Sequence, residues 1–105
     1  MRQVIAGKIY NTETASIVCE VSCMGYYYGD FNYHDTSVYR TKRGAFFLAG
    51  EGGPLSMWAK ASGNNGHVGG SGIRVLSEHE ARGYMERADC DPDEFAAAGF
   101  VINEA

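Results

Sequence analysis

The feature that most constrains the fold is a pair of strand-forming segments joined by a short polar turn. Residues 37–41 (SVYRT) and 45–49 (AFFLA) are rich in aromatic, aliphatic and β-branched side chains, and Lys42, Arg43 and Gly44 lie between them. Such runs favour β-strands, and Gly44 can adopt the left-handed conformation that a short hairpin loop requires. The pattern predicts a central β-hairpin over about residues 37–50.

Two further strands are predicted to flank this hairpin. Residues 14–22 alternate, so that one side of the strand carries Ala15, Ile17, Cys19 and Val21. A period of two over this length is typical of a half-buried strand. Residues 73–76 (IRVL) predict a last short strand, and residues 3–5 (QVI) are compatible with another.

The C-terminal third predicts a helix over about residues 77–89. Ser77 and Glu80 have the spacing of a capping box, which satisfies free amides at a helix start. The residues that follow form one apolar stripe at helical spacing: Ala81, Tyr84, Met85 and Ala88.

A second helix is predicted over about residues 92–99. Asp91, Pro92 and Glu94 repeat the start signal, and Gly99 supplies a stop. Strands followed by helices in a chain of 105 residues predict one α+β domain, residues 1–105, built on a short antiparallel β-sheet.

The segments between these elements are expected to be less regular. Residues 25–35 (GYYYGDFNYHD) have turn residues at both ends and predict a long aromatic loop. Pro54 suits the first turn of a short helix over residues 55–60, and the glycine-rich residues 62–72 predict a flexible connector.

Composition points to a cytoplasmic protein. No apolar run is long enough to cross a bilayer, and the N-terminal residues lack the apolar core of a signal peptide, so no membrane association is expected. The three cysteines are an odd number, which together with a reducing cytoplasm predicts free thiols.

Metal and cofactor motifs are not evident. Cys19 and Cys23 would lie about 13 Å apart on a strand, and the paired C-x2-C or H-x3-H units of structural zinc sites do not occur. The glycine-rich connector leads into a strand at Ile73 and lacks the order of a phosphate-binding loop. We therefore expect no metal and no cofactor.

Catalytic motifs are equally absent, so we expect no enzymatic activity and no catalytic residues. The chain lacks the serine elbow of hydrolases, and Ser56 and Lys60 do not have S-x-x-K spacing. A small hydrolase built around His34 or His67 is a less favoured alternative, because imidazole can serve as a base near neutral pH.

Aromatic and basic residues are concentrated in the N-terminal half. Tyrosine and arginine dominate protein-interface hot spots, and the same mixture can stack on single-stranded nucleic acid and neutralise it. The predicted contact residues of this half are Tyr26, Tyr27, Tyr28, Phe31, Tyr33, Arg40, Lys42 and Arg43.

Acidic residues are concentrated in the C-terminal half. Residues 1–50 contain five bases and four acids, whereas residues 51–105 contain four bases and nine acids. An acidic helical surface favours a basic partner over general nucleic-acid binding. The predicted contact residues of this half are Glu78, Glu86, Asp89, Asp93 and Glu94.

Short motifs occur along most of the chain, at residues 7–15 (GKIYNTETA), 38–48 (VYRTKRGAFFL), 50–53 (GEGG), 63–65 (GNN) and 76–81 (LSEHEA). With these motifs the sequence resembles a family of small proteins found in bacteria and archaea, often near phage and plasmid genes. The family has no settled enzymatic activity, so the resemblance brings no catalytic residues. It implies a protein of a mobile element, and small acidic proteins of this kind are often inhibitors of host defence, anti-CRISPR proteins among them.

The function expected from these features is non-enzymatic inhibition of a host protein complex, a CRISPR effector in particular. Acidic C-terminal helices would occupy a basic nucleic-acid channel, with the aromatic loop and the hairpin tip as anchors. This hypothesis assumes an aromatic and basic end of the sheet set against an acidic helical end. The alternative is a single-stranded nucleic-acid-binding module that uses the aromatic and basic hairpin surface.

Overall fold

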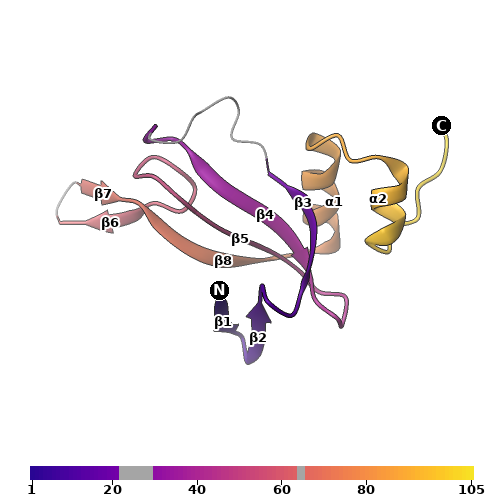
Figure 1. Ribbon diagram of the computed structural model, residues 1–105, viewed down its shortest axis with the longest axis horizontal. Coiled ribbons are helices and arrows are strands. Elements are labelled where there is room, and N and C mark those ends of the chain that lie inside the picture. The colour runs from indigo at the N-terminus through magenta and orange to yellow at the C-terminus, as the bar shows by residue number, and fades with distance from the viewer. Residues whose placement is uncertain (22–29, 64–65) are drawn as a thin grey trace.

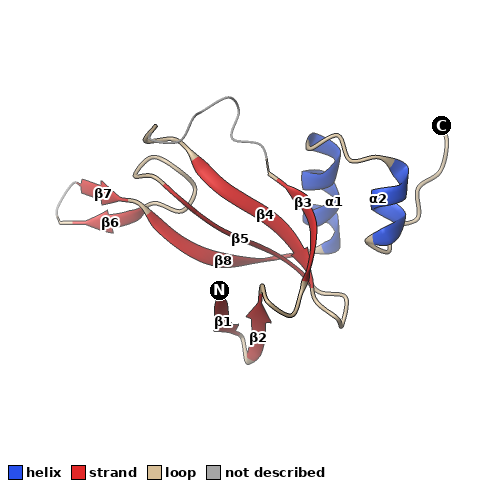
Figure 2. Cartoon of the chain, in the orientation of Figure 1, coloured by secondary structure: helices blue, strands red, loops and turns tan. Residues whose placement is uncertain are grey.

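A computed structural model describes residues 1–21, 30–63 and 66–105 of the chain. Strands form most of the regular structure and two helices follow them, which confirms the α+β class (Figures 1 and 2). The elements are β1 (Arg2–Ile5), β2 (Lys8–Asn11), β3 (Ser16–Glu20), β4 (His34–Arg40), β5 (Phe46–Gly52), β6 (Lys60–Ser62), β7 (Gly66–Val68), β8 (Gly70–Leu76), α1 (Glu78–Arg87) and α2 (Pro92–Ala97).

The predicted hairpin is the centre of the fold and is longer than expected. β4 and β5 pair from Arg40 opposite Phe46 to His34 opposite Gly52, so the first strand takes in the end of the predicted aromatic loop. Gly44 has a φ of 90°, the conformation for which a glycine was expected. β3 and β8 flank the hairpin, giving an antiparallel sheet with the order β3-β4-β5-β8.

The expected strict alternation in the strand before the hairpin is wrong. The register shifts between Ile17, opposite Tyr39, and Cys19, opposite Val38. Such a β-bulge adds one residue to one strand and changes which side chains face the core. Ile17 is consequently 64% exposed, whereas Cys19 is buried. A period-two pattern cannot reveal a bulge, because the bulge is defined by the partner strand.

Both faces of the sheet are covered. On one face, α1 and α2 pack on the sheet and form the larger core, whose buried members are Cys19, Val38, Phe46, Leu48, Trp58, Leu76, Ala81, Met85, Phe95 and Ala98. On the other face, the β1–β2 hairpin lies over a smaller core of Tyr10, Phe47, Ala49 and Ile73. Burying β5 on both faces explains why its sequence is apolar without alternation.

The β1–β2 hairpin was only partly predicted: residues 3–5 gave a weak strand signal, and β2 was not predicted. Ala6 and Gly7 connect the strands with φ values of 51° and 78°, as a two-residue type I′ turn requires. Tyr10 anchors the hairpin, because its ring meets Phe47 edge-on with 5.5 Å between the ring centroids. Alanine at the first turn position, in place of the usual asparagine, aspartate or glycine, masks this hairpin in the sequence.

The expected short helix over residues 55–60 is wrong. This segment forms consecutive turns and folds back over the helix-covered face of the sheet. Leu55 N donates a hydrogen bond to Phe31 O at 2.9 Å. Trp58 is part of the core, with only 5% of its surface exposed. Tertiary contacts of Trp58 therefore override the local helix signal that Pro54 supplies.

Residues 62–72 are not the flexible connector that was expected. Residues 60–68 form the antiparallel β6–β7 hairpin, of which residues 64–65 lie outside the described part. β8 begins at Gly70, which pairs with Gly52, three residues before the predicted start. Glycine at position 72 leaves room for the neighbouring indole, since an added Cβ would lie 3.3 Å from Trp58 Cζ3.

Both C-terminal helices and their caps are confirmed. Ser77 and Glu80 form a capping box at α1, and Asp91 and Glu94 form another at α2. Two members of the apolar stripe, Ala81 and Met85, are fully buried. No helix in the described ranges is long and apolar enough to span a membrane.

Candidate functional site

The residues predicted to contact a partner lie on three separate parts of the molecule. Phe31 and Tyr33 precede β4, whereas Arg40 ends it and Lys42 and Arg43 follow in the turn. A seven-residue strand spans about 20 Å, so the aromatic and basic groups lie at opposite ends of the sheet. The expectation of one aromatic and basic end is wrong for these described residues; Tyr26, Tyr27 and Tyr28 lie outside them.

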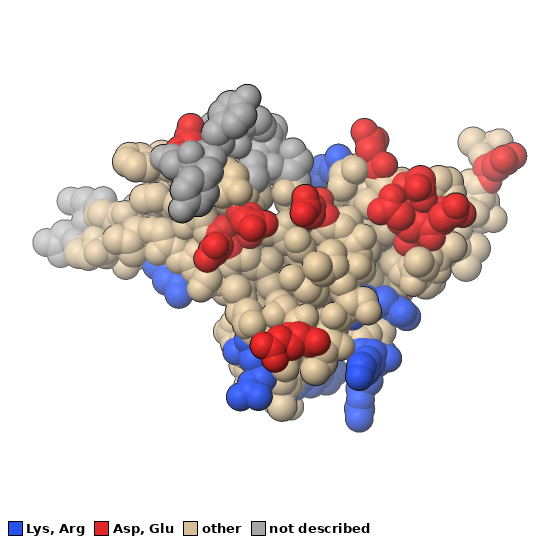
Figure 3. Space-filling view, in the orientation of Figure 1, with Lys and Arg blue, Asp and Glu red and all other residues tan. Residues whose placement is uncertain are grey.

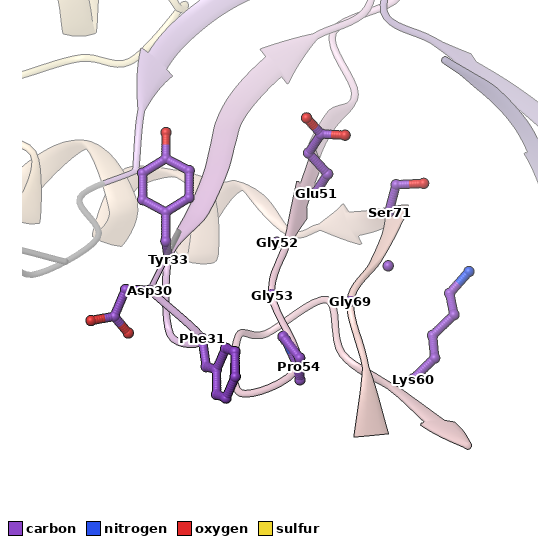
Figure 4. A pocket seen from close by; sticks show the side chains of 11 residues that line it. Asp30, Phe31, Tyr33, Glu51, Gly52, Gly53, Pro54, Lys60, Gly69 and Ser71 are labelled. Carbon is purple, nitrogen blue, oxygen red and sulfur yellow. The ribbon is translucent and has the colours of Figure 1, made fainter. Parts of the chain in front are cut away.

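The first part is a cleft of about 580 Å³, called here the glycine cleft, at the end of the sheet remote from the helices (Figure 4). Phe31 is 64% exposed, and Figure 4 shows the Tyr33 ring pointing away from the Phe31 ring. The residues that line the cleft are Asp30, Phe31, Tyr33, Glu51, Gly52, Gly53, Pro54, Lys60, Gly69, Gly70 and Ser71.

Backbone contacts hold the mouth of this cleft in shape. Gly53 N donates to Tyr33 O at 3.0 Å, and Asn32 N donates to the Asp30 carboxylate at 2.9 Å. An added Cβ at Gly53 would lie 2.6 Å from Phe31 O, so only glycine allows this close approach. This close backbone contact explains the glycine at the end of the sequence motif of residues 50–53.

Beneath this end of the sheet, a buried hydroxyl ties the turns of residues 53–59 to β4. Thr36 Oγ1 accepts a hydrogen bond from Trp58 Nε1 at 2.7 Å and lies 2.8 Å from His34 Nδ1. Burial lowers the pKa of His34, and the negative charge of Asp35 opposes this effect. The burial of His34 therefore favours its neutral imidazole form.

The positions of the histidines give the hydrolase alternative little support. His34 pairs with Thr36, and His67 is exposed on β7. The lining of the glycine cleft includes neither of them. Neither His34 nor His67 therefore supplies a base within this cleft, as the hydrolase alternative would require.

The second part is the acidic helical face, defined here by the exposed carboxylates of Glu78, Glu86, Asp89, Asp93 and Glu94. Acidic side chains gather over α1 and α2 (Figure 3). Glu94 has a structural role as well, since its carboxylate accepts from Asp91 N at 3.2 Å in the capping box of α2. Asp89 has a φ of 54°, a conformation that aspartate and asparagine tolerate better than most residues.

A third acid of α1 illustrates the same capping role. The backbone and side-chain hydrogen bonds with Ser77 lower the pKa of Glu80, because they favour its ionised form. Ser77 N donates to Glu80 Oε1 at 2.9 Å. Glu80 and Glu94 are thus needed for helix capping, whereas Glu86, Asp89 and Asp93 take no part in either capping box.

The third part is a cleft of about 610 Å³ between the β1–β2 hairpin and the β4–β5 turn, called here the basic cleft. It brings the predicted Lys42 and Arg43 together with Lys8, which sequence reasoning missed. Lys8 is distant in sequence from Lys42 and Arg43, and the β1–β2 hairpin places it beside them in the basic cleft. Arg40 is not part of this lining: it is half-buried, with its guanidinium 6.0 Å from the Phe46 ring centre and beside Gly99. With Lys42 it lines a neighbouring cleft of about 480 Å³ that also includes Glu94.

Cys19 and Cys90 are free thiols, of which Cys19 is buried and Cys90 is half-buried. Burial raises the pKa of Cys19 to about 12 and also raises the pKa of Cys90. The described residues contain no cluster of histidine, cysteine and carboxylate groups suited to a metal ion. Cys23 lies outside the described residues, so the predicted Cys19–Cys23 separation is untested.

No family model matches this sequence, and neither a curated protein nor a solved structure was found to be similar to it. The resemblance to proteins of mobile elements stays a prediction. Functional inference therefore starts from the three surfaces described above.

Proposed function

We propose that this chain is a non-enzymatic binding protein of a mobile element that inhibits a host defence complex, with a CRISPR effector as the specific target. The acidic helical face would occupy a surface that normally binds nucleic acid. The observation that supports this proposal is the array of exposed carboxylates on α1 and α2 (Figure 3). The choice of a CRISPR effector follows from the resemblance to mobile-element proteins.

The charges of this face suit a basic partner. Residues 78–94 carry seven acids and two bases, a net charge of −5. Among the described residues no ion pair neutralises Glu86, Asp89 or Asp93. Charges of one sign gathered on a surface accelerate association with an oppositely charged site and favour correct over incorrect partners.

The face is also rigid, which favours tight binding. α2 is anchored by Phe95 and Ala98, which are both buried, and the Phe100 ring stacks on Phe46 with centroids 5.3 Å apart. Both helices begin with a complete capping box. A preorganised surface loses little conformational entropy when it binds.

The test is to neutralise the carboxylates that have no capping role, with the substitutions Glu86→Gln, Asp89→Asn and Asp93→Asn. Asparagine at position 89 retains tolerance for the positive φ, so the variant should fold. Affinity for purified, guide-loaded CRISPR effector complexes, measured by biolayer interferometry, should fall at least about tenfold, which is about 1.4 kcal/mol. Its dependence on salt should weaken as well.

The matched control removes three charges elsewhere, with Glu13→Gln, Glu20→Gln and Glu51→Gln, all exposed positions. Its affinity should stay close to that of the unmodified protein. Equal affinities of both variants would refute the role of the acidic helical face. Absence of binding to every effector complex would refute the choice of target.

A further inference from the structure

Charge is segregated on this molecule although its net charge is −4. In Figure 3, most of the visible Lys and Arg side chains gather along the lower side, around the β1–β2 hairpin and the β4–β5 turn, where acidic atoms are also visible, whereas the acids are denser over α1 and α2. An overall negative charge therefore does not describe the surface that a ligand would meet at the basic cleft.

Three cations from two hairpins surround the basic cleft. Lys8 begins β2, and Lys42 and Arg43 form the β4–β5 turn. All three are exposed, and none forms an ion pair with another described residue. The lining residues include no aspartate or glutamate: they are Gly7, Lys8, Ile9, Tyr10, Thr14, Thr41, Lys42, Arg43 and Ala45. All the charged side chains in the lining of this cleft are therefore positive.

The polar groups of the cleft suit an anion with several oxygen atoms. Thr41 Oγ1 accepts a hydrogen bond from Ala45 N at 3.0 Å, which leaves the hydroxyl proton to donate. Gly7 has a φ of 78° and open space where a side chain would stand, so a ligand can approach the backbone closely. Arginine and lysine together with hydroxyl groups are the usual donors to phosphate oxygens.

The cleft offers no exposed ring for stacking. Tyr10 is 6% exposed and meets Phe47 edge-on, and the exposed apolar residue beside it, Ile9, is aliphatic. Base recognition on single strands depends on aromatic platforms, and protein hot spots depend on aromatic anchors. Charge without such rings suits a phosphate backbone better than bases or a peptide.

We propose that the basic cleft binds the phosphates of a nucleic-acid backbone without regard to base sequence. Lys8 and Arg43 lie outside the neighbouring cleft in which Lys42 meets Glu94 of the acidic helical face, so the site would work whether or not that face binds a protein. Each neutralised phosphate contributes about −0.9 for a duplex, or about −0.7 for a single strand, to the slope of log affinity against log salt. Three cations therefore predict a slope of about −2 to −3.

The test measures fluorescence anisotropy of labelled oligonucleotides with the full chain, at salt concentrations from about 20 to 200 mM. Single-stranded and duplex DNA of two unrelated sequences form the arms. We expect salt-sensitive binding in the non-specific range, with dissociation constants of about 10⁻⁴ to 10⁻⁶ M. The two sequences should bind alike, and binding to either strand form supports the proposal.

The variant Lys8→Gln/Arg43→Gln should lose at least about tenfold in affinity and about 1.4 to 1.8 units of salt slope. The control Lys60→Gln/Arg82→Gln removes the same charge from exposed positions outside the basic cleft, and should lose little. Equal losses in both variants, or no salt-sensitive binding, would overturn the proposal. Binding of a poly-glutamate peptide as tight as that of DNA would overturn it in favour of an acidic protein ligand. Because no effector complex is present, failure here is distinct from failure of the proposed function.

Discussion

At the scale of single residues, the buried hydroxyl of Thr36 is important for the stability of the fold. Thr36 is 2% exposed, and its oxygen satisfies the indole N–H of Trp58. Gly50 makes this arrangement possible, because an added Cβ there would lie 2.8 Å from Trp58 Nε1. Arg74 covers the ring, with its guanidinium carbon 5.3 Å from the ring centre, and donates to Met57 O at 2.6 Å.

The substitution Thr36→Val should lower the free energy of unfolding by about 1–3 kcal/mol, because valine keeps the shape but leaves the Trp58 N–H buried without an acceptor. Urea denaturation followed by tryptophan fluorescence measures this directly, since Trp58 is the chain's sole tryptophan. The control Thr14→Val replaces an exposed threonine and should change stability by less than about 0.5 kcal/mol. Equal effects of the two substitutions would contradict the role given to this hydroxyl.

At the scale of elements, the β1–β2 hairpin is a cover for the sheet rather than an extension of it. It forms a separate two-stranded sheet and contacts the main sheet through side chains. Isolated two-stranded hairpins are marginally stable, so its order depends on the ring of Tyr10 packing against Phe47. The same packing places Lys8 at the rim of the basic cleft.

Tyr10→Ala should therefore destabilise the protein by about 3 kcal/mol, because it removes a buried aromatic side chain. Ile9→Ala is the matched control on the same strand, since Ile9 is 65% exposed and should cost less than about 0.5 kcal/mol. Thermal unfolding followed by circular dichroism compares the two. A similar loss for both variants would mean that the hairpin does not depend on this anchor.

At the scale of the whole molecule, two oppositely charged surfaces lie on different elements. The acids belong to α1 and α2, and the bases belong to the β1–β2 hairpin and the β4–β5 turn (Figures 1 and 3). The hairpin lies on one face of the sheet and the helices on the other, but the two surfaces meet at a cleft of about 480 Å³ that both Lys42 and Glu94 line. Glu86, Asp89 and Asp93 lie outside the lining of this cleft, and so do Lys8 and Arg43. Most of each surface can therefore serve its own ligand.

Combining the two sets of charge substitutions should give additive effects. Lys8→Gln/Arg43→Gln should leave effector binding nearly unchanged, and Glu86→Gln/Asp89→Asn/Asp93→Asn should leave oligonucleotide binding nearly unchanged, apart from a small effect of net charge. The free-energy effects of substitutions at distant sites without shared partners usually add to within about 0.5 kcal/mol. Binding titrations of the five-substitution variant with each ligand would reveal any larger coupling, which would mean that the surfaces bind one ligand jointly.

The sequence alone was enough for several features that short-range interactions set, although it missed the local β1–β2 and β6–β7 hairpins. The hairpin turn at Gly44 and the capping boxes at Ser77 and Asp91 depend on neighbouring residues and were predicted correctly. Predicting the acidic helical face needed only the positions of the acids on those helices. Because these interactions span a few residues, local sequence contains the information.

Only the tertiary structure decided the rest. The bulge at Ile17 depends on the register with β4, and the turns around Trp58 depend on a buried acceptor at Thr36. The separation of Phe31 from the basic turn follows from the length of β4, whereas the meeting of Lys8 with that turn follows from packing on Phe47. Contacts between residues distant in the chain create these features, and no local pattern records them.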